Sequence, residues 1–565
     1  MAKRASDSRL NFKQDAPIGC AAAEDDEAFL DECFVDNGSL QTLLDPLSGK
    51  RIVVGRPGAG KSALLRKLAA TAKNVIQIDP QDLAIQHITN SQVIRESTRA
   101  GVNMDTFYQS LWQHIFCIEL LKEKYKFSNQ LGFRQTFDRL GQKLGWGRNR
   151  KRAWEYLQSW GHEEFWEDAH TRAVRMTTKI EDQLRGTIGA GFSSIGLTAQ
   201  VGRKSSSEIS DETVYDAQQI VNAAKLRELH DVMELMSEDI FNDEDSYYIV
   251  IDDLDRNWVD NVVRYRLIRA LVESIKRFKR LRNVKVIIAL RRDLIDKIIE
   301  QTRDSGFQEE KYEDLYFQLR WTEDHLRQVL SSRIGLMASR AYSRKNLSFK
   351  DIFPPKMGGH DTMKYILLHT QNRPREIIQF VNKILEAAAG RSEISKRTIL
   401  EAEEQYSEQR LRALCDEWID YLPALNKCVS LLAGPKPRFR INELSFEKVQ
   451  NCILEAATFQ GSETDGLVRA ANKYMETCES STLAQAMPFL REAFSTFHRL
   501  GLVGLKLHSQ STVRWCGDAV GYTKPVAIEL DTFVEIHPMY QRAFGVRLSP
   551  DEESVADSAM IKRAS

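Results

Sequence analysis

The chain has 565 residues, enough for two to four domains, and 42% of them are apolar, so sizeable cores can form. Its 79 basic and 79 acidic residues cancel. A net charge of zero excludes a protein that is drawn to nucleic acid or to an anionic membrane by its overall charge, and any such contact must use a local patch.

Cysteine usage and hydropathy indicate the compartment. The eight cysteines are scattered without a CxxC pair, which favours reduced thiols. The first residues lack the apolar stretch of a secretory signal, and the longest apolar runs are far too short to cross a bilayer. We therefore expect a soluble, cytoplasmic protein without a membrane contact.

The first part of an α/β core is expected at 28–100, after a polar and loose N-terminal segment at 1–27. There the sequence RIVVG runs into a glycine-rich turn and a helical pattern, and a second strand follows at 74–79. A strand, a turn, a helix and a strand in this order form a βαβ unit, which implies a parallel sheet.

A long helical insertion is expected at 101–238. It is rich in tryptophan, and aromatic residues at helical spacing favour a core over a platform for stacking nucleic-acid bases. Its basic run at 148–152 favours a solvated face. The Gly- and Ser-rich stretch at 187–212 predicts a small hairpin followed by a linker.

The second part of the core is expected at 239–320, with one strand ending at Ile251 and another at 284–290. Internal repeats are absent from the sequence. The rest of the chain divides into three parts: a helical lid at 321–395, a helical domain at 396–548 and a flexible tail at 549–565. Near the end of the domain at 396–548, the sequence predicts a helix, a glycine turn and two β-like segments.

The glycine-rich turn matches the pattern GxxxxGK[ST] in full. Its glycines allow backbone angles that point successive N–H groups inward, and the helix that follows adds its positive end, so the turn is suited to hold phosphate. Lys61 is suited to reach the β- and γ-phosphates of a nucleotide, and the Ser62 hydroxyl to bind Mg²⁺. The candidate nucleotide-binding residues are Gly55, Pro57, Gly58, Ala59, Gly60, Lys61, Ser62 and Ala63.

Hydrolysis also needs carboxylates, and the stretch YYIVIDDLDR supplies them. Its apolar strand ends in Asp252 and Asp253, and ligands of an open parallel sheet bind at the carboxyl ends of the strands. We expect Asp252 to hold Mg²⁺ through water and Asp253 to polarise the attacking water. An acid pair that only caps the next helix is the alternative.

Four arginines are candidate nucleotide sensors. Arg291 and Arg292 follow the strand at 284–290, where a cation could sense a γ-phosphate. Arg373 and Arg375 stand at the start of a predicted helix, where the helix dipole disfavours cations, which suggests a contact with nucleotide or with an acidic partner. For all four, an ordinary surface salt bridge is the alternative.

In their order and spacing, GRPGAGKSALL, IVIDDLDR, VIIALRRDLID and NRPREIIQFVN resemble the KAP and STAND-like bacterial P-loop ATPases, over residues 15–390. Further along, LREAFSTFHRLGLVGLK and VRWCG resemble a winged helix. The resemblance implies an additional-strand ATPase core that uses ATP and Mg²⁺, a helical lid, and a switch that often serves defence against phage or mobile DNA. The chain departs from membrane KAP proteins by lacking transmembrane helices between the first two motifs, and from large STAND proteins by lacking a repeat array.

Three functions fit these motifs. The first, which we expect, is an ATP-hydrolysing switch whose nucleotide state gates its own assembly or a separate effector protein, because the sequence has no second catalytic constellation. The second is a loader or remodeller of duplex DNA, which the basic stretch at 276–285 favours and the zero net charge disfavours. The third is a small-molecule P-loop kinase, which would not need the long helical regions.

Overall fold

The chain, described here by a computed structural model, divides into two compact units. The sheet unit spans residues 36–320, and the helical unit combines residues 1–35 with residues 321–565. Within the described ranges, no helix is both long enough and apolar enough to cross a membrane. The described residues are 11–83, 91–99, 101–126, 177–178, 181–182, 184, 215, 217–219, 221, 226–241, 245–256, 261–302, 309–342, 347–434, 436–459, 465–477, 482–508, 511–516 and 525–546.

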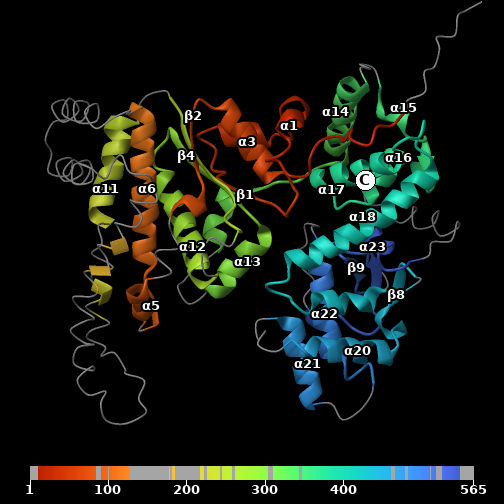
Figure 1. The fold of residues 1–565 in the computed structure, drawn as a ribbon. Coiled ribbons are helices and arrows are strands. Elements are labelled where there is room, and N and C mark those ends of the chain that lie inside the picture. The colour runs from red at the N-terminus through yellow and green to blue at the C-terminus, as the bar shows by residue number, and fades with distance from the viewer. Residues whose placement is uncertain are drawn as a thin grey trace, which may run out of the picture. The chain divides into compact units, whose positions relative to one another are not determined.

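A five-stranded sheet forms the centre of the sheet unit (Figure 1). Its order is β2–β3–β4–β1–β5, and every neighbouring pair is parallel. The two strands β3 and β4 are buried along their whole length, as expected for parallel strands covered on both faces. The strands are β1 (Ile52–Val54), β2 (Asn74–Ile78), β3 (Tyr247–Ile251), β4 (Val284–Leu290) and β5 (Tyr316–Gln318). The first four confirm the strands predicted from sequence, whereas β5 is an addition.

Helices pack on this sheet, which lies between α3 and the pair α6 and α12 (Figure 1). Helix α6 is buried around most of its surface, and Trp112 donates from Nε1 to the carbonyl of Leu267 in α12 over 3.0 Å. The prediction that the tryptophans form a core is confirmed for Trp112. Outside the described residues lie the other four tryptophans of the predicted insertion, Trp146, Trp154, Trp160 and Trp166, together with the basic run at 148–152 and the stretch at 187–212. The helices are α2 (Ser39–Leu44), α3 (Lys61–Thr71), α5 (Gln92–Arg99), α6 (Asp105–Tyr125), α11 (Leu226–Leu235), α12 (Asn261–Phe278) and α13 (Arg292–Gln301).

The first half of the helical unit is a helix bundle with a small two-stranded sheet, β6 and β7. Helix α17 begins with proline at its first position and packs along α18, and it buries the apolar side chains of one face. The elements are α1 (Glu27–Cys33), α14 (Glu323–Tyr342), α15 (Phe349–Ile352), β6 (Lys356–Met357), β7 (His360–Asp361), α16 (Thr362–Leu368), α17 (Pro374–Ala387) and α18 (Lys396–Glu417).

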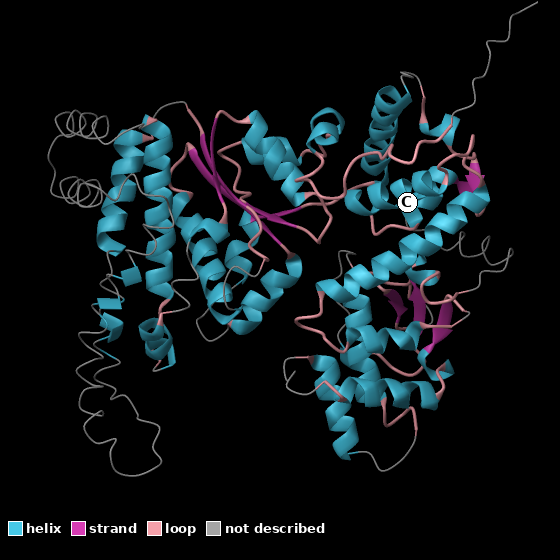
Figure 2. Ribbon diagram, viewed as in Figure 1, coloured by secondary structure: helices cyan, strands magenta, loops and turns pink. Residues whose placement is uncertain are grey.

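The second half of the helical unit joins helices to a three-stranded antiparallel sheet of order β8–β10–β9 (Figure 2). The predicted helix, glycine turn and strand are present, because α22 ends at Gly501, which has a left-handed φ of 78°, and β9 follows. The elements are α19 (Leu425–Cys428), β8 (Arg438–Arg440), α20 (Phe446–Ala457), α21 (Gly466–Thr477), α22 (Met487–Leu500), β9 (Val503–Lys506), β10 (Phe533–Ile536) and α23 (Pro538–Gln541).

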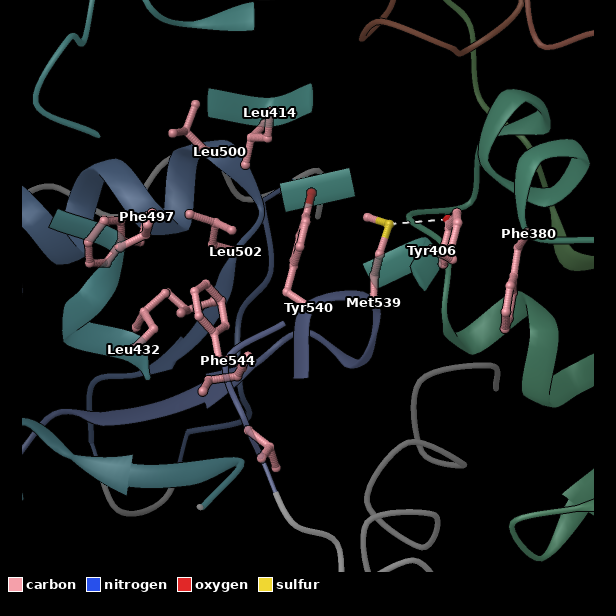
Figure 3. Close-up of a cluster of buried hydrophobic side chains, with 14 of the residues drawn as sticks. Phe380, Tyr406, Leu414, Leu432, Phe497, Leu500, Leu502, Met539, Tyr540 and Phe544 are labelled. Atoms are coloured by element: carbon pink, nitrogen blue, oxygen red, sulfur yellow. Dashed lines mark hydrogen bonds between the residues drawn. The ribbon is translucent and has the colours of Figure 1, made fainter. Parts of the chain in front are cut away.

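One hydrophobic core runs through both halves of the helical unit (Figure 3). The ring of Tyr406 in α18 stacks on Phe380 in α17 with centroids 4.6 Å apart, and its hydroxyl donates to Sδ of Met539 in α23 over 3.3 Å. The residues on either side of the boundary that we expected between 395 and 396 therefore contribute to one hydrophobic core.

The N-terminal segment differs most from its prediction. Residues 11–26, here called the N-terminal strap, bury Phe12 and Ile18 in the helical unit, although the sequence predicts a loose segment at 1–27. The Ile18 N–H donates to Oδ1 of Asn382 over 2.9 Å, and Nδ2 of the same side chain donates to the Gly19 carbonyl over 2.8 Å. Arg333 adds a bond to the Ile18 carbonyl over 3.0 Å. The strap is thus held by side chains that hydrogen-bond to its backbone. The polar composition of the strap does not reveal these contacts.

Candidate functional site

The glycine loop, residues 55–60, connects β1 to α3. Gly58 and Gly60 adopt left-handed φ angles of 77° and 91°, which residues with side chains rarely adopt. A Cβ added to Gly55 would lie 3.3 Å from Cβ of Ala59, so the loop is closely packed on itself. The local sequence therefore forms a tight turn that ends at the N-terminus of an 11-residue helix.

Lys61, the first residue of α3, folds back over the glycine loop. Its Nζ donates to the carbonyls of Gly55 over 3.1 Å and of Arg56 over 3.2 Å. Burial lowers the pKa of its ammonium group, and the carboxylates of Asp255 and Asp252 act in the opposite direction. These acids therefore lie close enough to Lys61 to interact with it electrostatically.

Strand register explains why these groups meet. Val54 of β1 is level with Leu290 of β4, and Ile251 of β3 is level with Ile288. The three strands are parallel neighbours, so the glycine loop, the residues after β3 and the residues after β4 all leave the sheet at its carboxyl edge. The acids and the glycine loop therefore lie at the same edge of the sheet.

The acids occupy a tight turn after β3, here called the acidic turn, residues 252–256. Asp253 has a positive φ of 58°, an uncommon conformation for a residue with a side chain. The turn is closed by the Arg256 N–H, which donates to the Asp253 carbonyl over 3.1 Å, and by an ion pair of 3.1 Å between their side chains. Backbone strain of this kind is concentrated at functional sites, so it adds a reason to look for chemistry here.

Arg291 connects the end of β4 to the acidic turn. Its guanidinium forms a two-pronged contact with Asp293, over 3.0 and 2.9 Å, and its Nη1 lies 3.7 Å from Oδ2 of Asp255. Arg292 instead pairs with Asp296 along α13 at 3.1 Å, on a half-exposed surface. Arg291 thus lies with Lys61 and the acids at the carboxyl edge. Arg292 instead forms a surface salt bridge, which was the alternative to a sensing role.

Arg373 and Arg375 belong to the helical unit, where both bind neighbours of their own. Arg373 lies 3.3 Å from the buried carboxylate of Glu376, within the first turn of α17. Arg375 donates from Nε to the Ala21 carbonyl of the N-terminal strap over 3.1 Å. Arg373 thus has a carboxylate neighbour, Glu376, within its own helix.

Two buried cations near the sheet, Lys285 and Arg51, are not predicted from the sequence. Lys285 lies inside β4, fully buried, and its Nζ donates to the carbonyls of Thr42 and Asp45 over 2.9 and 2.7 Å. Burial, with repulsion from Arg51, lowers the pKa of Lys285 to about 7. The only sign of this buried cation in the sequence is a lysine within an otherwise apolar strand. A hydropathy profile shows that lysine only as a break in the apolar run.

The comparisons with known proteins concern the helical unit. Residues 324–415 match the family described as the FunZ-associated C-terminal helical domain. The match begins in α14, ends in α18 and crosses the boundary that we expected at 395. No curated protein matches the chain.

Proposed function

We propose that the sheet unit binds Mg·ATP and hydrolyses it as a P-loop ATPase. The observation that carries the proposal is the arrangement at the carboxyl edge, where Lys61 and the glycine loop adjoin the acidic turn and Arg291. The strand order supports it, because β4 lies between the strand that leads to the loop and the strand that ends in the acids, as in an additional-strand core.

The residues of the glycine loop fit a nucleotide and its metal ion. Left-handed glycines at Gly58 and Gly60 leave backbone N–H groups to form a nest for phosphate oxygens, at the positive end of α3. The ammonium of Lys61 would exchange the two loop carbonyls for phosphate oxygens. Ser62 and Asp252 would hold Mg²⁺, which typically takes few protein oxygens and keeps water and phosphate as its other ligands.

In the proposed reaction a bound Mg²⁺ would supply neutralisation of phosphate charge, and the residues of the chain would supply position and electrostatics. Asp253 would accept a hydrogen bond from the attacking water and orient it. Arg291 would place its positive charge near the γ-phosphate, while its contacts with Asp293 hold the guanidinium in place. The same edge thus offers one group for each part that phosphoryl transfer requires.

We further propose that nucleotide state gates assembly of the chain or a separate effector protein, in bacterial defence against phage or mobile DNA. This part rests on the family resemblance of the motifs and on the helical unit, which offers a second body for a nucleotide-driven change. Particle mass and phosphate release should be measured without nucleotide, with Mg·ADP and with Mg·ATP. A chain that neither binds nor hydrolyses Mg·ATP would refute the ATPase, and unchanged mass and partner binding would refute the switch.

A DNA-associated ATPase is the second candidate. The three-stranded order β8–β10–β9, with helices between β8 and β9, supports it, because a winged helix has such a sheet, although with two helices where this chain has α20, α21 and α22. The basic residues of α22 argue against it. His498 is 1% exposed, and Arg491 donates to the Ile528 carbonyl over 2.9 Å, which leaves Arg499 as the exposed one of the three. ATPase stimulation by duplex DNA that falls steeply with salt would favour this candidate over the switch.

A further inference from the structure

Arg264 lies in the first turns of α12, close behind the acidic turn, and only 1% of its surface is exposed. Its Nη1 donates to the carbonyl of Arg256 over 2.9 Å and also reaches the carbonyl of Asp255, at 3.5 Å. A side chain of α12 thus binds the backbone of two consecutive residues of the acidic turn.

The position of this cation calls for an explanation. The N-terminus of a helix carries a partial positive charge, so an arginine in the first turns of α12 is disfavoured by the helix dipole. Burial of a guanidinium adds a desolvation cost that hydrogen bonds have to offset. The two turn carbonyls supply acceptors for Arg264, which indicates that its place in the fold is tied to the acidic turn.

Two other side-chain contacts of the acidic turn are weak. Asp253 keeps an unfavourable positive φ, and its ion pair with Arg256 is half-exposed and therefore weak. Asp255 reaches Arg291 only at 3.7 Å. A buried, charge-assisted contact to the backbone is stronger than either of these surface pairs.

We propose that Arg264 is a positioning residue for hydrolysis, which holds the acidic turn so that Asp253 keeps its place beside the glycine loop. This inference rests on the ATPase proposed above. Arg264 itself touches neither nucleotide nor water, and it acts through the backbone of Asp255 and Arg256. Binding of Mg·ATP depends mainly on the glycine loop, so loss of Arg264 should affect turnover far more than affinity.

Arg269 provides a matched control on the same helix. It is also buried, at 6% exposure, but it pairs with Asp105 at 3.5 Å and with Glu273 at 3.4 Å, away from the acidic turn. Arg264→Gln and Arg269→Gln therefore remove the same charge from the same helix at similar burial. Arg264→Lys keeps the charge but reaches less far, and it serves as a second variant if glutamine impairs folding.

The experiment measures Kd for Mg·ATP, kcat and KM of phosphate release, and amide hydrogen exchange over residues 252–256. Arg264→Gln should lower kcat on the order of 100-fold, the loss typical of misplaced catalytic groups, with Kd and KM nearly unchanged. Exchange in the acidic turn should rise. Guanidinium ion at low millimolar concentration should restore part of the rate in Arg264→Ala, whereas equal concentrations of sodium chloride or urea should not.

Each other outcome contradicts the inference. A wild-type kcat in Arg264→Gln, or equal losses of kcat and Mg·ATP binding in Arg264→Gln and Arg269→Gln, would assign Arg264 a purely structural role or none. Those results would leave the proposed ATPase intact, because the wild-type chain would still turn over. A wild-type chain that does not hydrolyse Mg·ATP would overturn the ATPase and this inference together.

Discussion

Arg375 in α17 donates from Nε to the backbone carbonyl of Ala21 over 3.1 Å, and so joins the helical bundle to the N-terminal strap. The bond is one of several in which helical side chains bind the backbone of the strap. Arg375, which the sequence suggests as a nucleotide sensor, therefore already has a hydrogen-bond acceptor within the helical unit. Sensing by Arg375 requires that it exchange this carbonyl for a phosphate.

Arg373→Ala and Arg375→Ala test whether the helical unit senses the γ-phosphate. We expect ADP affinity to stay nearly unchanged and ATP-dependent compaction to disappear in at least one variant, because a charge-assisted bond of about 1.5 to 3 kcal/mol would be lost. Small-angle scattering and protease protection measure the compaction. If both variants compact as the wild type does, the two arginines are structural and Arg291 becomes the better candidate.

Lys61→Ala should abolish nucleotide binding and leave the chain folded. Within the described residues, Nζ of Lys61 donates to the carbonyls of Gly55 and Arg56, so its removal leaves few groups without a hydrogen-bond partner. A fluorescence titration with labelled ATP, accompanied by circular dichroism, measures both properties. Arg66→Ala, on the exposed side of the same helix, is the matched control and should bind normally. Normal binding by Lys61→Ala would show that the glycine loop is not the site.

Asp252→Asn and Asp253→Asn should differ in their effects. Asp253→Asn should still bind Mg·ATP and lose turnover, because its carboxylate is assigned to the water. Asp252→Asn should weaken Mg²⁺ binding as well, because its carboxylate is assigned to the metal. Mg²⁺ titrations of nucleotide affinity, read beside phosphate release, separate the two roles. Equal affinity and equal loss of turnover in both variants would contradict the assignment.

Lys285→Met should change how stability depends on pH. The folded pKa of Lys285 is about 7, below its unfolded value of about 10.4, so between these values the unfolded chain binds one proton more. Unfolding free energy of the wild type should then rise with pH across this window, by up to about 1.4 kcal/mol per unit from this group. Urea unfolding of both proteins at pH 6 to 9 measures the difference. Parallel curves would show that Lys285 keeps its proton when folded.

The sheet and the glycine loop could be predicted because their signals are local. Strands β3 and β4 are buried on both faces and therefore appear as largely apolar runs, and each is followed by a polar residue that marks the carboxyl edge. The pattern GxxxxGK[ST] encodes the conformations that Gly58 and Gly60 adopt. These features depend on neighbours a few residues away, which a sequence displays directly.

The remaining features depend on residues far apart in the chain. Strand β5 has only three residues, which is too few for a strand pattern to be recognised in the sequence. It is a strand because it pairs with β1. Arg264 and Arg269 look alike in the sequence of α12, and only tertiary burial and the carbonyls near Arg264 distinguish them. The N-terminal strap likewise has a polar composition, and its partners follow more than 300 residues later.

The N-terminal strap has a consequence for biosynthesis. Ile18 and its partner Asn382 are 364 residues apart in sequence, and a ribosome adding about 5 to 20 residues per second needs roughly 20 to 70 s to span that interval. Throughout that time the whole of the sheet unit can emerge while Phe12 and Ile18 have no groove to enter. The residues of the strap therefore leave the ribosome long before the partners that bury them, and during translation their apolar side chains are a natural target for chaperones.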